Sequence, residues 1–497
     1  MSELKLKRTL EIIPGAISWG IILILVLLAL FKPVICAVLV IIFDFYWIIR
    51  TMYLTTLLIM AYRKLAYQKN RDWLAACQEL PASVKKLKEL YQLVIFPVYK
   101  EGMDILRPSL QALKDSHYPH ENLIVIMAFE ARNPNSKDIA MKLEEEFKGV
   151  FFRYLTTFHP DNLPGEKRAK GANATWAAKK SAELLTVNNI PFENVIVSCF
   201  DADTCVDKEY FGCLSFHFLT NPKPHQASYQ PMPVYNNNIW HAPSFARLVE
   251  MSASFCQLIE SMRLEKFVTF SSHSMSFKTL VDIDYWPLDM VSDDSVVYWK
   301  AYLFYKGDYK VIPLYTTVSM DVAYGDNIIK TIIIQYKQKR RWAWGIENFP
   351  YVVLRFIQDK DIPLFKKMRK SFHLLESHIT WAVWAMIITV IAPLPIFLGG
   401  VIFSQIPIGY NLPRITGLLL NFTLGTSLIW IILSFTTLPR RPRDVSWFKN
   451  IIMILEWVTV PFIILILGSN PALDAQSRLM LAKYMEFSPT EKKRKVV

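Results

Sequence analysis

Long apolar stretches at both ends of a β-rich middle constrain the fold of this 497-residue chain more than any other feature. Near the start, residues 12–31 carry no charged side chain, and residues 33–60 carry only Asp44 and Arg50. Each stretch is long enough for a helix to cross about 30 Å of hydrocarbon at ~1.5 Å per residue. The first stretch lacks a small-residue cleavage site, so we expect it to stay as an anchor. The sequence therefore predicts a membrane-spanning hairpin.

Apolar stretches return after the middle of the chain, at 379–403, 415–437 and 451–468. Three crossings would place the following segment on the far side of the membrane. That segment ends in the basic run EKKRKVV, however, and basic flanks are typical of the cytoplasmic side. Either one apolar stretch re-enters without crossing, or the charge rule is violated here. The sequence leaves the number of crossings open.

The net charge of +13 does not by itself indicate a nucleic-acid partner, because many of the 56 Lys and Arg residues lie beside apolar stretches. That distribution is the one expected next to membrane spans. The six cysteines show no paired metal-ligand spacing. We expect them to be free thiols in a reducing compartment.

Between the apolar stretches, short β-rich runs alternate with polar and helical stretches. The runs are LVIFPVY (93–99), NLIVIMAF (122–129), GVFFRYL (149–155) and NVIVSCFDAD (194–203). Strands that alternate with helices predict an α/β domain with a mostly parallel sheet and helices on both faces. Such sheets bind ligands at the carboxyl ends of their strands. The polar residues that end these runs are therefore candidates for a site.

The fourth run ends in an Asp-x-Asp pair, Asp201 and Asp203. Two carboxylates at this spacing suit Mg²⁺ or Mn²⁺ that bridges a diphosphate. A solvated turn at the end of the strand is the alternative interpretation.

Two further carboxylates, Asp293 and Asp294, directly precede a helix-like segment. Acidic residues at this position commonly cap a helix and interact with its dipole. Alternatively, one of them is a general base that takes a proton from an attacking hydroxyl. One Asp could cap the helix while the other reacts.

A Gln-x-x-Arg-Trp arrangement, Gln338, Arg341 and Trp342, lies in an amphipathic stretch before the later apolar segments. Arg can bind a diphosphate through two hydrogen bonds, and Trp offers a face on which a sugar ring stacks. A basic and aromatic helix at the membrane interface is the alternative, since these residue types are common there.

In this order, and between membrane segments, Asp-x-Asp, Ser-Asp-Asp and Gln-x-x-Arg-Trp resemble the processive family 2 glycosyltransferases, which include cellulose, chitin and hyaluronan synthases. Glucosylceramide synthases share the last motif. The resemblance implies a GT-A-like domain inserted between transmembrane helices. It divides the chain into a hairpin (1–62), a cytoplasmic transferase domain (63–330), interface helices (331–372), a membrane region (373–470) and a basic tail (471–497).

The resemblance also implies roles for single residues. Asp294 would be the catalytic base with Asp293 beside it, and Asp201 and Asp203 would bind the metal. The implied nucleotide-binding residues are Glu101, Glu130, Lys170, Asn173, Asp201, Gln338 and Arg341. The implied acceptor-binding residues are Gln230, Tyr235, Asn236 and Trp342. Glu130 stands where the family usually has Asp, and His273 and Lys278 also depart from the family pattern. MEFSPTEK resembles a gating loop through Phe487, Thr490 and Lys492, with Pro489 in place of Val.

The activity implied by the resemblance is inverting, metal-dependent transfer of a hexose from a nucleotide-sugar, with UDP as the expected nucleotide, to a growing polysaccharide. The partners would be this donor, a carbohydrate acceptor and the lipid bilayer, with no nucleic acid. We expect a multi-pass protein of the plasma membrane with its catalytic domain in the cytoplasm. Two alternatives stay open: transfer of one sugar to a lipid, and a membrane transporter with a nucleotide-binding insert, whose intramembrane charges would include Asp44, Arg50 and Glu456.

Overall fold

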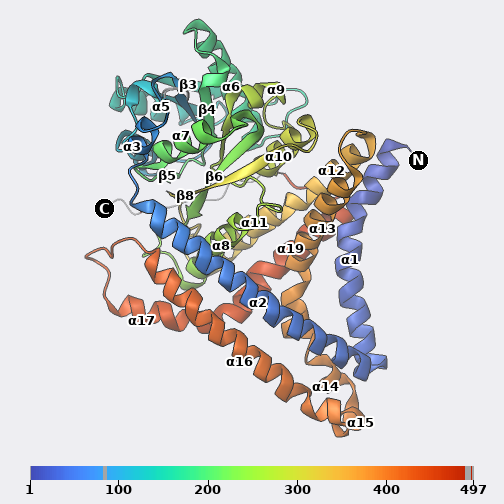
Figure 1. Cartoon of the computed structure of the whole chain (residues 1–497). Helices are drawn as coiled ribbons and strands as arrows, with labels where there is room; N and C mark the ends of the chain where they lie inside the picture. The colour runs from blue at the N-terminus through green and yellow to red at the C-terminus, as the bar shows by residue number, and fades with distance from the viewer. Residues whose placement is uncertain (1, 82–86, 487–493, 495–497) are drawn as a thin grey trace. The chain divides into compact units, whose positions relative to one another are not determined.

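The computed structural model describes residues 2–81, 87–486 and 494. The chain forms two compact units (Figure 1). The helical unit comprises Met1–Met60, Trp240–Phe255 and Asp326–Met485, and the sheet unit comprises Ala61–Ile239, Cys256–Gly325 and Glu486–Val497.

The sheet unit contains one sheet whose strands, among the described residues, follow the order β3-β2-β1-β4-β7-β6-β8-β5. Neighbouring strands β1 to β4 are parallel, as are β6 and β8, whereas β7 and β5 are antiparallel to their neighbours. The strands are β1 (Tyr91–Val98), β2 (Leu123–Glu130), β3 (Arg153–His159), β4 (Val195–Cys199), β5 (Cys205–Val206), β6 (Ala227–Val234), β7 (Ser274–Ser276) and β8 (Lys310–Ser319).

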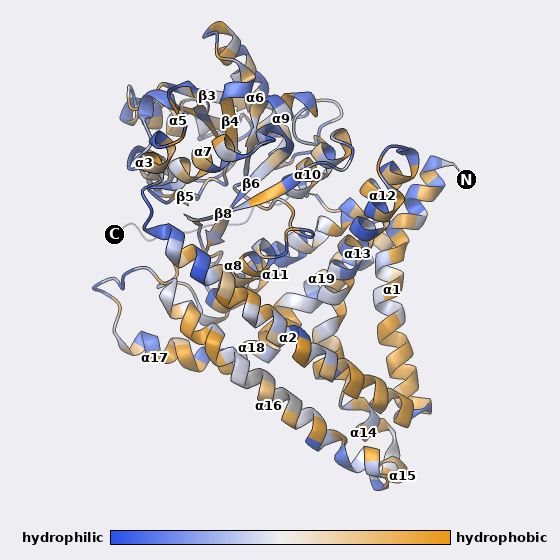
Figure 2. Ribbon diagram, in the orientation of Figure 1, coloured by the Kyte–Doolittle hydropathy of each residue, from blue (hydrophilic) through white to orange (hydrophobic). Residues whose placement is uncertain are grey.

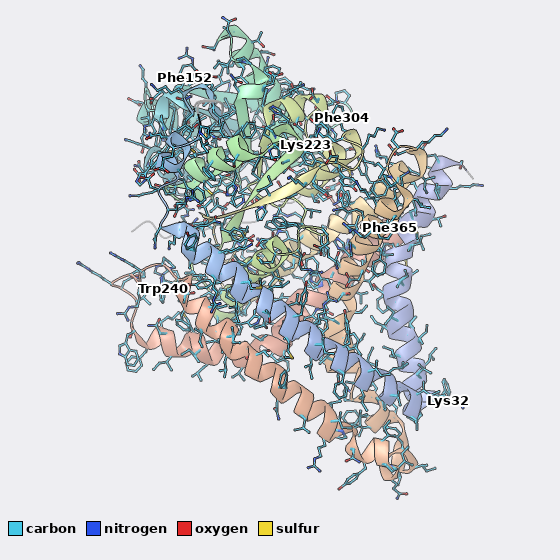
Figure 3. The ribbon with its side chains drawn as sticks, in the orientation of Figure 1. Lys32, Phe152, Lys223, Trp240, Phe304 and Phe365 are labelled. Atoms are coloured by element: carbon cyan, nitrogen blue, oxygen red, sulfur yellow. The ribbon has the colours of Figure 1, made fainter. Side chains whose placement is uncertain are left out.

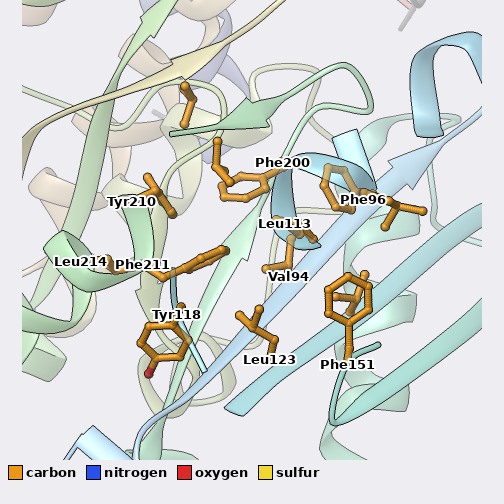
Figure 4. Close-up of a cluster of buried hydrophobic side chains, with 14 of the residues drawn as sticks. Val94, Phe96, Leu113, Tyr118, Leu123, Phe151, Phe200, Tyr210, Phe211 and Leu214 are labelled. Carbon is orange, nitrogen blue, oxygen red and sulfur yellow. The ribbon is translucent and has the colours of Figure 1, made fainter. Parts of the chain in front are cut away.

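Helices cover both faces of this sheet. They are α3 (Trp73–Gln78), α4 (Met103–Lys114), α5 (Ser136–Glu146), α6 (Lys170–Val187), α7 (Tyr210–Thr220), α9 (Phe277–Asp282) and α10 (Asp293–Phe304). Helix α8 (Ser244–Ser261) contributes residues to both units. Alternate side chains of β1 and β2 pack with α4, α5 and α7 in one apolar core (Figure 4). Because strand side chains alternate in direction, the intervening residues are buried on the other face, where α6 packs on β1, β2 and β3.

The predicted fold class, a mostly parallel sheet with helices on both faces between apolar helices, is confirmed. All six cysteines are free thiols, as expected. The third strand starts later than predicted, at Arg153 instead of residue 149. Gly149 has a positive φ of 73°, and Phe151 packs into the apolar core before the strand begins. A turn that needs glycine therefore replaces the first residues of the predicted run.

The helical unit is built from apolar helices, whose hydrophobic residues are plain along α1, α2 and α16 (Figure 2). Its helices are α1 (Glu3–Phe31), α2 (Pro33–Lys69, which continues into the sheet unit), α11 (Ile328–Ala343), α12 (Asn348–Gln358), α13 (Leu364–Met386), α14 (Leu394–Leu398), α15 (Gly400–Gln405), α16 (Pro407–Thr436), α17 (Phe448–Leu455), α18 (Val460–Ile463) and α19 (Asn470–Met480). Among the described residues, four helical stretches are long and apolar enough to cross a membrane: Glu3–Phe31, Pro33–Lys69, Leu364–Ile391 and Phe448–Met480. The first two form the predicted hairpin, with Lys32 at its turn (Figure 3).

The predicted apolar stretch 379–403 is not one continuous helix. Helix α13 begins 15 residues before it, at Leu364, and continues through a π-helical turn to Ile391. Pro393 and Pro395 follow, and Gly400 has a positive φ of 68°. Proline lacks the backbone donor that a helix needs, so the helix breaks here into the short α14 and α15.

Polar contacts join α1, α13 and α19 within the helical unit. Ser18 Oγ donates to Gln476 Oε1 over 2.6 Å, and Gln476 Nε2 donates to the carbonyl of His378 over 2.8 Å. A Cβ at Gly15 would lie 2.9 Å from the carbonyl oxygen of Gln476, so the α1 and α19 backbones approach closely there. Small residues and interhelical hydrogen bonds are typical of helix packing in membranes.

We expect Leu110→Ala to destabilise the sheet unit, because Leu110 of α4 is fully buried in its apolar core. A cavity of this kind costs about 2–5 kcal/mol. The matched control is Leu264→Ala, since Leu264 is 58% exposed. Thermal unfolding of the full chain in detergent should show a lower midpoint for Leu110→Ala alone. Equal midpoints for the two variants would contradict this packing.

Candidate active site at the carboxyl edge of the sheet

The acidic residues predicted at strand ends lie at one edge of the sheet. Glu130 ends β2, Glu101 follows β1, and Asp201 and Asp203 follow β4. Because β2, β1 and β4 are parallel neighbours, their carboxyl ends meet at the same edge. This is the edge at which open α/β sheets bind ligands.

Lys170, the first residue of α6, joins two of the predicted motifs. Its Nζ lies 2.8 Å from Asp201 Oδ1 and 3.0 Å from Asp294 Oδ1. Burial alone would lower the pKa of Lys170, but Asp201 and Asp294 outweigh burial and hold the pKa well above its usual value. A charged ammonium therefore connects the first Asp of Asp-x-Asp with the second Asp of the later pair.

The two neighbouring carboxylates at the start of α10 differ in exposure. Both lie in the first turn, where the helix dipole favours negative charge. Asp293 is 3% exposed, whereas the side chain of Asp294 is 25% exposed. Thr269 Oγ1 donates to the Asp294 carbonyl over 2.6 Å. Asp294 is thus the member of the pair that can reach a ligand.

Gly171 brings the start of α6 close to the loop before α10. A Cβ at this position would lie 2.6 Å from the carbonyl oxygen of Pro287 and 3.1 Å from the Cβ of Asp293. Only a glycine fits such a close approach without movement of the backbone. Gly171 therefore allows Lys170 to reach both carboxylates.

A serine-rich loop before β7 supports Asp201. Ser271 Oγ donates to Asp201 Oδ2 over 2.6 Å. Ser272, whose φ is 62°, places its Oγ 2.8 Å from Thr204 Oγ1. Both oxygens of the Asp201 carboxylate are thus oriented by neighbours, Lys170 on one side and Ser271 on the other.

His273, a departure from the family pattern, lies buried beside the site. Its Nδ1 lies 3.0 Å from the Phe270 carbonyl, to which it donates, and 3.9 Å from Asp294 Oδ1. Burial lowers the pKa of His273, and Asp294 only partly opposes that effect. A neutral His273 that holds the loop fits this geometry.

The predicted nucleotide-binding residues on the first two strands have different surroundings. Glu101 accepts hydrogen bonds from the backbone N–H groups of Tyr99 and Lys100, at 2.8 and 3.1 Å, and so closes the turn after β1. Glu130 is buried between Arg132 Nε, at 3.3 Å, and His159 Nδ1, at 3.5 Å.

Asn173 and Gln230 make hydrogen bonds to the protein backbone. Asn173 Nδ2 donates to the Ala128 carbonyl over 2.7 Å, which ties α6 to β2. Gln230 is fully buried in β6, and its Oε1 accepts from the Phe270 N–H over 2.7 Å. Both side chains thus support the site residues around them.

The other predicted acceptor residues, Tyr235 and Asn236, follow β6. Sequence reasoning missed the next residue, Asn237, whose Nδ2 donates to the carbonyl of Asp203 at 3.0 Å and to Asp321 Oδ1 at 2.9 Å. It also missed Asp321, whose N–H donates to Asp203 Oδ2 over 2.8 Å. The available signal was a lone Asp two residues after the apolar strand β8.

Gln338, Arg341 and Trp342 lie on α11 in the helical unit. Gln338 is buried, and Lys339 Nζ lies 3.4 Å from the centre of the Trp342 ring. Lys339 also pairs with the buried Glu250 at 3.0 Å. The proposed gating-loop residues Phe487, Pro489, Thr490 and Lys492 lie outside the described residues.

The site fits a divalent cation in part. Asp201 and Asp203 offer hard carboxylate oxygens, which Mg²⁺ and Mn²⁺ prefer. Asp203 is 1% exposed, however, and its Oδ2 already accepts from Asp321. No group of three His, Cys, Asp or Glu side chains that could hold a metal occurs in the part of the chain that the structure describes. A cation here would take its other ligands from a diphosphate and water.

Neither the family models nor the curated proteins include a match to this chain. Solved structures with similarity include the mannosyltransferase PcManGT from Pyrobaculum calidifontis in complex with GDP-Man and Mn²⁺. It is 14% identical, with a TM-score of 0.41, over 77% of this chain and 98% of that one. Residues 1–349 of TarS from S. aureus are 12% identical, with a TM-score of 0.37, over 68% of this chain and 90% of that one.

We expect Gly171→Ala to destabilise the chain by about 1–3 kcal/mol, because the new methyl group would displace the backbone at Pro287. Gly20→Ala is the matched control, since a Cβ at Gly20 in α1 would meet nothing within 4 Å. The measurement is the thermal unfolding midpoint of the full chain in detergent. A midpoint for Gly171→Ala as high as that of the control would rule out the tight approach.

Proposed function

We propose that this chain is a membrane-bound glycosyltransferase that transfers a sugar from a nucleotide-sugar to an acceptor hydroxyl. The observation that carries the proposal is the contact of Lys170 with both Asp201 and Asp294. These residues are far apart in the sequence, yet they form one charged cluster at the carboxyl edge of the sheet. Sugar transfer from a nucleotide-sugar needs cationic groups that bind the phosphates. It also needs a carboxylate that takes the proton of the acceptor hydroxyl.

Asp294 is the proposed general base. It would take the proton of the acceptor hydroxyl while that oxygen attacks the anomeric carbon and the bond to the nucleoside diphosphate breaks. This single displacement inverts the configuration at that carbon. Asp294 is partly exposed whereas Asp293 is buried, so Asp294 is the better candidate for the general base.

Positive charge at the diphosphate would assist the leaving group. Lys170 supplies an ammonium beside Asp201. A divalent cation held by Asp201 and Asp203 would supply more positive charge to stabilise the leaving diphosphate. As the family resemblance implies, Arg341 is a further candidate for the diphosphate, Gln338 for the nucleotide and Trp342 for the acceptor. Glu101, Glu130 and Asn173 are proposed near the nucleotide.

The acceptor is proposed to be a growing polysaccharide, with a single sugar transfer to a lipid as the alternative. The four membrane-capable stretches among the described residues support a membrane protein. Basic residues beside the apolar stretches support a cytoplasmic sheet unit, and the plasma membrane is the proposed location. Incubation with a labelled donor separates the two acceptor classes, because a glycolipid extracts into organic solvent and a polymer does not.

The donor is tested by a screen of UDP-, GDP- and dTDP-sugars for release of nucleoside diphosphate by the purified full chain. We expect release with one nucleotide class, its loss with a chelator, and its return with Mn²⁺ or Mg²⁺. A transporter with a nucleotide-binding insert would bind a nucleotide without this metal-dependent release. Absence of release with every donor would refute the transferase proposal.

We expect Asp294→Asn to lower the rate of transfer about 10²–10⁴-fold, because an amide keeps the shape of the side chain but cannot take a proton. Nucleotide binding, measured by calorimetry, should persist. Asp289→Asn is the control, since Asp289 is exposed in the same loop. Near-normal turnover in Asp294→Asn would exclude Asp294 as the base.

A further inference from the structure

An arginine from the basic segment after the last membrane-capable helix binds inside the sheet unit. Arg494 Nε lies 2.9 Å from Asp321 Oδ1 and 3.1 Å from Asp321 Oδ2. Its Nη2 lies 2.8 Å from Asp321 Oδ1 and donates to the carbonyl of Asp203 over 3.0 Å. One guanidinium therefore contacts both Asp321 and the second residue of the Asp-x-Asp pair.

Asp321 holds the Asp203 turn through its backbone as well. Its N–H donates to Asp203 Oδ2, and Asn237 Nδ2 bridges the Asp203 carbonyl and Asp321 Oδ1. Asp321 thus orients the carboxylate of Asp203. Asn237 and Arg494 orient the backbone carbonyl of Asp203. The conformation of the turn at Asp203 therefore depends on the position of the Asp321 carboxylate.

The Asp321 carboxylate is buried, so a positively charged partner is required to stabilise it. Its side chain is 0% exposed, and that of Arg494 is 11% exposed. A buried carboxylate without a charged partner is strongly unfavourable, and removal of one partner of a buried pair leaves that penalty uncompensated. The planar guanidinium of Arg matches a carboxylate through two parallel hydrogen bonds, which the ammonium of Lys cannot do.

We propose that Arg494 is a positioning residue that fixes the Asp203 turn through Asp321. Arg494 would then form part of the candidate site rather than serve only as a charge on a membrane flank. The effect on the turn is independent of the activity. The effect on catalysis rests on the proposed function.

Hydrogen exchange of the full chain in detergent, followed by mass spectrometry, tests the effect on the turn. We expect Arg494→Ala to speed exchange about tenfold or more in peptides that cover 200–207 and 317–323, since charge-assisted hydrogen bonds are lost. Arg494→Lys should restore part of the protection, and millimolar methylguanidinium should restore it in Arg494→Ala. Lys483→Ala, which removes one exposed positive charge, and a peptide from β2 (123–130) are the controls.

The catalytic readout is the Mn²⁺ concentration that gives half-maximal nucleotide release. We expect Arg494→Ala to raise this concentration about tenfold, with a smaller change in the maximal rate and with rescue by methylguanidinium. Unchanged hydrogen exchange in both peptides would overturn the proposal. Faster nucleotide release by Arg494→Ala would also overturn it, because Arg494 would then make an inhibitory contact. If the unaltered chain releases no nucleotide, the proposed function fails, but the exchange result still decides the role of Arg494.

Discussion

The ammonium of Lys170, mostly buried between Asp201 and Asp294, is the interaction on which the candidate site depends. Two carboxylates of like charge would repel each other near the edge of a sheet if no cation stood between them. Lys170 has this position because α6 begins there and because Gly171 lets the helix start close to Pro287. The local backbone thus determines which charges meet.

Neutral polar groups around this charged cluster hold its members in place. Ser271 orients Asp201, Gln230 holds the backbone at Phe270, and Thr269 binds the carbonyl of Asp294. All three contacts involve one loop before β7. A buried polar group without a hydrogen-bond partner costs free energy. A movement of this loop would break several such hydrogen bonds at once and is therefore unfavourable.

Much of the fold followed from patterns in the sequence. Alternating strands and helices predicted the sheet, and apolar length predicted the hairpin of α1 and α2. The structure differs from the prediction where glycine or proline changes the backbone. Gly149 forms a turn before β3, and Pro393 and Pro395 break the helix after α13. The domain limits, such as 63–330, and the site roles stay predictions.

The candidate site was predictable only where residues form a pattern along the chain. Asp201, Asp203 and Asp294 stand in short motifs, but the pairing of Lys170 with two of them depends on the start of a helix. Asp321 and Asn237 belong to no motif, because their partners are set by strand order rather than by spacing. Arg494 was recognised only as part of a basic run, and a run of like charges does not reveal which member binds.

The place of Arg494 also bears on how often the chain crosses the bilayer. Gly325 and Arg494 both belong to the sheet unit, and residues 326–485 between them belong to the helical unit. If the sheet unit lies on one side of the membrane, a chain that leaves it and returns to it crosses an even number of times. The parity of the later crossings is then even. Among the described residues, two of the later helical stretches are membrane-capable, Leu364–Ile391 and Phe448–Met480. A contact made by one arginine thus constrains the topology of some 160 residues that precede it.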